Sequence, residues 1–89
     1  MICLEIIHLR SSAEPLESLA HRIRESLGAG GEDAEVTLYR RDGLETDVAV
    51  HIRRRAATGS DGPSGLGLRL ASALRALGLV EHTLWQELR

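Results

Sequence analysis

The sequence predicts an α+β domain of the ferredoxin-like type: a four-stranded antiparallel sheet of order 4-1-3-2 with two helices on one face. Three observations predict it. Apolar residues at helical spacing continue up to Gly78, which is expected to adopt the left-handed conformation that closes a helix. After Gly78, apolar and polar residues alternate, as they do in a strand. The Asp-Gly pair at 42–43 separates two alternating segments, which indicates a hairpin. The order strand, helix, strand, strand, helix, strand fills 89 residues, which we take as one domain covering 1–89.

The first half of the chain supplies the first strand and the first helix. Residues 2–9 are apolar at both parities, which is typical of a strand in the middle of a sheet. Cys3 lies in this strand and is expected to be a small buried hydrophobe. Ser12 is the expected N-cap of the helix, whose apolar positions repeat from Leu16 to Leu27, and Gly28 is expected to close it.

The second half supplies a hairpin, a loop, a helix and the last strand. Residues 34–40 and 46–53 alternate apolar and polar side chains and are expected to pair. Residues 54–63 contain no periodic apolar residue and are predicted to form the longest loop. Ser64 is the expected N-cap of the second helix. Residues 80–88 alternate again and form the predicted last strand.

Composition limits the classes of function. The net charge of −2 gives no electrostatic basis for binding nucleic acid or an anionic membrane, and all eleven basic residues are Arg. The single cysteine excludes an internal disulfide, and no apolar run has the length of a membrane span. The start of the chain lacks the features of a signal peptide. We therefore expect a cytoplasmic protein without a metal or cofactor and without nucleic-acid or membrane partners.

One face of the predicted sheet is left without a helix. We expect this open face to display Cys3, Glu5, Ile7, Leu9, Thr37, Tyr39, Ala49, His51, Arg53, Thr83, Trp85 and Glu87. Such a face is half apolar and holds both aromatic residues, and a bare apolar patch of this size is unusual on a monomer. It can form a homodimer, leave a ligand pocket between two sheets, or stack nucleobases. The acidic charge and the absence of a Gly-aromatic motif in the middle strands argue against nucleobases.

The topology resembles that of the dimeric α+β barrel proteins, which include antibiotic-biosynthesis-monooxygenase-like and stress-responsive barrel domains. The hairpin VTLYRRDGLETDVAVHIRRR is similar in kind to theirs, whereas SGLGLRLASALRALGLVEHTLWQEL matches no family signature. The resemblance covers the whole chain as a pattern of elements. It implies dimers with back-to-back sheets and, in some members, a cavity between sheet and helices for a small aromatic substrate. Catalytic residues in that superfamily are not uniform, so none is carried over to this chain.

His8 and His82 are the first candidates for chemistry, since the first and last strands are expected to be antiparallel neighbours. Their parity predicts both imidazoles on the helix-covered side. Two imidazoles with a carboxylate can hold a metal, or one can act as a general base. No third ligand has suitable spacing, because Glu81 is expected on the opposite face. The alternative is two histidines at the edge of the core that bond to backbone groups.

A second candidate group lies on the open face: Tyr39, His51, Arg53 and Trp85. Arg53 could pair with a substrate carboxylate in a pocket there, with His51 as a further catalytic candidate. Alternatively, the aromatic residues are anchors of a dimer interface, a role in which Tyr, Trp and Arg are enriched.

A third candidate group is an anion site at the start of the second helix, formed by Arg54, Arg55, Ser64 and Gly65. Free amides at a helix start can hold an anion, although the simpler role of Ser64 is that of an N-cap.

The sequence therefore supports a self-associating binding or interaction module, with a cofactor-independent monooxygenase or isomerase acting on a small aromatic or carboxylated molecule as the alternative. A filled interior and a flat sheet interface favour the first, and an enclosed cavity with a histidine in its wall favours the second.

Overall fold

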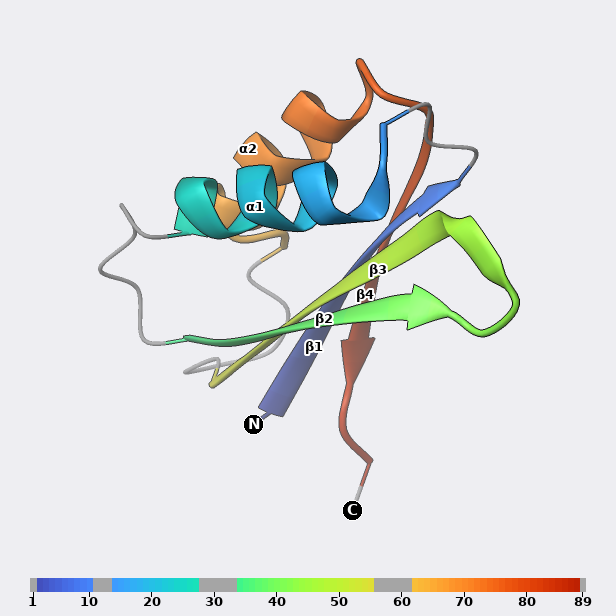
Figure 1. Cartoon of the computed structure of the whole chain (residues 1–89). Coiled ribbons are helices and arrows are strands. Elements are labelled where there is room, and N and C mark those ends of the chain that lie inside the picture. Colours follow the sequence, from blue (N-terminus) through green and yellow to red (C-terminus); the bar gives the residue numbers. More distant parts are fainter. Residues whose placement is uncertain (1, 11–13, 28–33, 56–61, 89) are drawn as a thin grey trace.

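The computed structural model describes residues 2–10, 14–27, 34–55 and 62–88. The elements are β1 (Ile2–Arg10), α1 (Leu16–Leu27), β2 (Ala34–Arg41), β3 (Leu44–Arg55), α2 (Gly65–Leu74) and β4 (Leu79–Gln86). The sheet order is β2-β3-β1-β4, and each neighbouring pair is antiparallel. Both helices lie on one side of the sheet (Figure 1). The predicted ferredoxin-like fold is confirmed.

Two of the predicted turn and cap residues, Gly43 and Ser64, behave as expected, whereas Gly78 does not. Gly43, in the predicted hairpin turn, has φ +78°, a conformation that favours glycine. Ser64 caps α2 as predicted. However, α2 ends at Leu74, and Gly78 is not left-handed, so the predicted closure at Gly78 is wrong. The backbone N–H of Leu77 donates to the carbonyl oxygen of Leu74, a tight turn that satisfies the helix end without a left-handed residue. The predicted caps at residues 12 and 28 lie outside the described residues.

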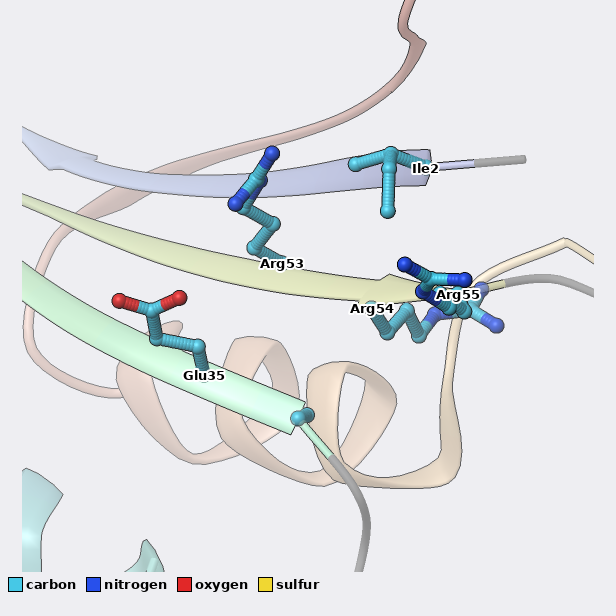
Figure 2. Close-up of a pocket in the computed structure, with 6 residues that line it drawn as sticks. Ile2, Glu35, Arg53, Arg54 and Arg55 are labelled. Atoms are coloured by element: carbon cyan, nitrogen blue, oxygen red, sulfur yellow. The ribbon is translucent and has the colours of Figure 1, made fainter.

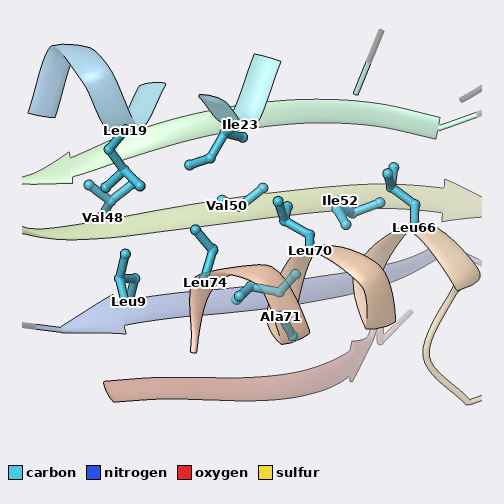
Figure 3. Close-up of a cluster of buried hydrophobic side chains, with 11 residues drawn as sticks. Leu9, Leu19, Ile23, Val48, Val50, Ile52, Leu66, Leu70, Ala71 and Leu74 are labelled. Carbon is cyan, nitrogen blue, oxygen red and sulfur yellow. The ribbon is translucent and has the colours of Figure 1, made fainter. Parts of the chain in front are cut away.

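The core fills the space between the two helices and the inner face of the sheet (Figure 3). Its buried side chains are Ile7, Leu9, Leu19, Ile23, Val48, Val50, Ile52, Leu66, Leu70, Ala71 and Leu74. Leucine, isoleucine and valine dominate because the chain contains no Phe and its two aromatic residues lie elsewhere. Each large aliphatic side chain buried in this way stabilises the fold by roughly 1.5–3 kcal/mol relative to its exposure to water.

The main difference from the sequence-based expectation is which side chains of β1 lie beneath the helices. Ile7 is directly paired with Val50 of β3, and both are fully buried beneath the helices. Cys3, Glu5 and Leu9 share that side, as alternation along a strand requires, and all are buried. The prediction that this set lies on the open face is therefore wrong. Cys3 is nevertheless buried as predicted.

The opposite set of β1 side chains occupies the open face: Ile2, Leu4, Ile6 and His8. The ambiguity arose because β1 is apolar at both parities, so its pattern alone does not distinguish the two sides. The expected facing of the other three strands is confirmed by their register: Ile6 pairs with His51 of β3 and with Thr83 of β4, and Tyr39 of β2 pairs with Ala49 of β3.

Two adjacent isoleucines test this assignment directly. We expect Ile7→Ala to lower the free energy of unfolding by about 2–5 kcal/mol, because it opens a cavity in the core. The matched change Ile6→Ala removes the same atoms from a half-buried open-face position and should lower it by clearly less. Equilibrium denaturation, at the lowest protein concentration that Trp85 fluorescence allows, measures both. A larger loss for Ile6→Ala would contradict the observed facing of β1.

Candidate functional site

The two histidines suggested as a pair lie on opposite faces of the sheet. His82 Nε2 is 2.6 Å from Glu5 Oε2 on the side covered by α2. His8 Nε2 is 3.4 Å from Asp47 Oδ2 on the open face. The prediction that both imidazoles lie on the helix-covered side is therefore wrong for His8, for the same reason that the facing of β1 was wrong. Each histidine has a carboxylate neighbour of its own.

Glu5 is a buried carboxylate between the sheet and the start of α2. Its residue is only 1% exposed. Oε1 accepts hydrogen bonds from the backbone N–H of Ser64 at 3.2 Å and from the Ser64 hydroxyl at 2.7 Å. Oε2 is bonded to His82 Nε2, and Arg54 Nε lies 3.9 Å from Oε1. Burying a carboxylate is strongly unfavourable without such partners, so these groups make a glutamate tolerable in the core.

Ser64 connects this carboxylate to the helix. Its Oγ accepts a hydrogen bond from the backbone N–H of Gly67 at 2.9 Å while its hydroxyl proton is donated to Glu5. The start of a helix carries partial positive charge, which favours a nearby anion. The side chain of Glu5 occupies that position, so the start of α2 is held by an anion from the chain itself.

The residues predicted to form an anion-binding site do not come together in one site. Ser64 bonds to Glu5, and Arg54 Nη2 donates to the carbonyl oxygen of Gly62 at 2.6 Å. Gly65 begins α2 and is exposed. Arg55 is exposed at the end of β3 and does not share these contacts.

The open face carries a central apolar strip with an aromatic residue on each side. The strip consists of Ile2, Leu4 and Ile6 of β1, all half-buried. Tyr39 on β2 is 50% exposed and Trp85 on β4 is 57% exposed, so both rings lie on the open face as expected. The indole N–H of Trp85 donates to Thr83 Oγ1 at 2.9 Å, which fixes the ring. The ring centroids of Tyr39 and His51 are 4.5 Å apart.

A pocket of about 240 Å³ lies at one end of this face, between Tyr39 and His8. Both residues pair across the sheet with Ala49, whose small side chain separates the two rings. The Asp47 carboxylate is nearly buried, and its Oδ2 contacts Arg41 Nη1 at 3.3 Å as well as His8. A carboxylate beside Nε2 favours the tautomer with the proton on Nε2 and leaves Nδ1 as the basic nitrogen. His8 thus lines the pocket with its Nε2 beside the Asp47 carboxylate.

A larger pocket of about 510 Å³ lies at the other end, where β3 finishes. It is lined by Ile2, Ala34, Glu35, Arg53, Arg54 and Arg55 (Figure 2). A neighbouring pocket of about 270 Å³ shares Ile2 and Arg53 with it and continues to Leu4 and Trp85. The predicted open-face group is thus split, with Arg53 and Trp85 at this end and Tyr39 beside His51 nearer the other.

Within the described residues, no group of three His, Cys, Asp or Glu side chains could hold a metal ion. Neither of the two helices described has the length and apolar character that crossing a bilayer demands.

Comparison with known proteins shows the fold. No family model matches the chain, and no curated protein matches it. Among solved structures, a variant of SnoaB, a cofactor-independent oxygenase from Streptomyces nogalater, superposes with a TM-score of 0.66 at 21% identity over 99% of this chain and 94% of that chain. A second SnoaB structure gives a TM-score of 0.60 at 20% identity over 99% and 93%. At this level of identity the likeness shows a shared fold, which agrees with the topology expected from the sequence.

Glu5 and Asp47 are the residues that the sequence-based candidates omitted. A signal for Glu5 existed, since a glutamate inside an apolar central strand must either face solvent or have buried partners. Its partners Ser64 and His82 are 59 and 77 residues away in sequence, so spacing could not identify them. Asp47 lies at the open-face parity of β3, and its burial depends on Arg41 and His8 from other parts of the sheet.

Gly67 gives a test of the Glu5 site. A Cβ at position 67 would overlap the Glu5 carboxylate, so Gly67→Ala should destabilise the fold by about 1–3 kcal/mol. Gly65→Ala, at an exposed position of the same helix, should be neutral or slightly stabilising. In a double-mutant cycle, Glu5→Asp shortens the carboxylate, so Gly67→Ala should cost less in that background. Equal costs in both backgrounds would contradict the contact.

Proposed function

We propose that this protein is a self-associating binding module and that its open sheet face is the interface with a second copy of the chain. The observation that carries the proposal is the central apolar strip of β1, flanked by the exposed rings of Tyr39 and Trp85 on a face that no helix covers. Among the described residues, a cluster of buried aliphatic side chains packs between the helices and the inner face of the sheet, which leaves the opposite face as a broad surface for binding. A chain of this length buries only about 60–65% of its unfolded surface, and self-association adds to that.

The size of the face agrees with a dimer. Four strands spaced about 4.8 Å apart and about eight residues long give a flat footprint of roughly 500 Å² per copy. Two such footprints reach roughly 1,000 Å², the lower bound for a specific interface. The side chains that project from the sheet add further buried area.

The charges on the face also suit a two-fold interface. Arg53 and Arg55 on β3 and Glu35 and Glu81 on the neighbouring edges are exposed, and none of them forms an ion pair within the described part of the chain. In a two-fold interface each patch meets its own copy. A surface that carries both signs is therefore compatible with a two-fold interface.

A single charge in the strip tests the proposal. We expect Ile6→Lys to convert the dimer to a monomer in multi-angle light scattering at micromolar concentration, since it buries a lysine in the middle of the interface. The control is Leu68→Lys, at a leucine of α2 that is 53% exposed and lies on the helical side, which should leave the mass unchanged. A monomeric native protein, or equal effects of the two substitutions, would overturn the proposal, provided circular dichroism shows both variants folded.

A second function is favoured by a different observation. The fold matches that of a protein described as a cofactor-independent oxygenase over nearly the full length of both chains. The pocket beside Tyr39 offers His8, positioned by Asp47, as a proton acceptor. We propose as the alternative a cofactor-independent monooxygenase or isomerase that acts on a small aromatic or carboxylated molecule.

This alternative has a direct assay. A panel of hydroxylated aromatic compounds is incubated with the protein, and oxygen uptake and product formation are followed by electrode and mass spectrometry. Activity should fall by about two to four orders of magnitude in His8→Gln, since a positioned general base contributes about that factor. His21→Gln, at an exposed histidine of α1, should keep full activity. Turnover that is unchanged in His8→Gln would exclude this site.

A further inference from the structure

The end of the open face where β3 finishes combines positive charge with an apolar surface. Arg53 and Arg55 have the same parity on β3, and Arg55 pairs with Ile2 while Arg53 pairs with Leu4 of β1. Leu4 pairs in turn with Trp85 of β4. One row across the sheet therefore runs from a guanidinium over a leucine to an indole ring.

The two pockets at this end adjoin each other, because Ile2 and Arg53 line both, and together they are called the groove. Figure 2 shows Arg53 reaching from β3 toward β1, with Arg55 at the end of the strand. On the far side, the ring of Trp85 is fixed by its hydrogen bond to Thr83. The groove thus has a cationic half on β3 and an apolar half on β1 and β4.

Of the three arginines that line this groove, only Arg54 has a carboxylate partner among the described residues, with its Nε 3.9 Å from Glu5 Oε1. Arg53 and Arg55 are exposed and form no ion pair with any residue that the structure describes. Glu35 is the cross-strand neighbour of Arg53, and its carboxylate also lacks an ion pair there. Arginine binds a carboxylate through two parallel hydrogen bonds, so the two free guanidinium groups are suited to a planar anion.

The flanking carboxylates limit the charge of that anion. Glu35 lines the outer edge of one pocket and Glu87 the outer edge of the other. A compact head group with one negative charge fits between them at β3, whereas a group with several negative charges would be repelled from both sides.

We infer that this groove binds a small monocarboxylic acid with an apolar body. The carboxylate pairs with Arg53 and Arg55, and the body lies over Ile2 and Leu4 against the ring of Trp85. This inference deepens the proposed function, since it names a ligand for the face that the module uses.

The test uses phenylpropanoate as the probe and the emission of Trp85, the single tryptophan of the chain, as the signal. We expect a saturable change in emission. Phenylpropanamide, which has the same body without the charge, should bind about tenfold or more weakly. The variant Arg53→Gln/Arg55→Gln should lose binding, whereas Arg24→Gln/Arg75→Gln, which removes the same charge from exposed positions on the helical side, should keep it. Arg55→Gln alone, at the strand end, gives the same comparison if the double variant is unfolded.

Three results would overturn the inference: no saturable signal, equal binding of the amide, or equal loss in both double variants. Displacement of the probe by an equal concentration of inorganic phosphate would also contradict it, because phosphate has no apolar body. The mass measured in the same samples separates this inference from the proposed self-association. If the protein is a monomer that binds phenylpropanoate, the groove inference stands and the proposed dimer fails. If it is a dimer without arginine-dependent binding, the proposed dimer stands and the groove inference fails.

Discussion

The buried carboxylate of Glu5 is the constraint on which the arrangement of the molecule depends. Its bonds to Ser64 and His82 join the central strand to the start of α2 and to the edge strand β4. Gly67 is needed above it because any Cβ there would overlap the carboxylate. A charged group can occupy such a position only when its partners are all in place, so the site specifies one facing of β1 and opposes the other.

This orientation of β1 determines which of its side chains lie on the open face. With Glu5 inward, alternation places Ile2, Leu4 and Ile6 outward, so the central strand contributes an apolar strip to a face without a helix. Charged and aromatic side chains from the outer strands frame this strip. The proposed self-association and the proposed carboxylate groove both depend on this orientation of β1, while the helix-covered side holds the aliphatic core and the Glu5 site.

The sequence predicted the order of elements, the sheet topology and the cap at Ser64, because these depend on local periodicity and on turn residues. It could not predict the facing of β1, since both sides of that strand are apolar and the deciding partners of Glu5 are distant in sequence. The pairing of His8 with His82 failed for that reason. Tyr39 and Trp85 were placed correctly, because their strands alternate cleanly and admit one facing.

Self-association through the open face can be tested by an isotope-filtered nuclear Overhauser experiment on an equimolar mixture of labelled and unlabelled protein. It detects methyl groups of one chain that lie within a few ångströms of another chain. We expect intermolecular signals at the methyl groups of Leu4 and Ile6 and none at those of Ile7 and Leu9. Signals at Ile7 or Leu9, or no intermolecular signal at any methyl group, would contradict this expectation.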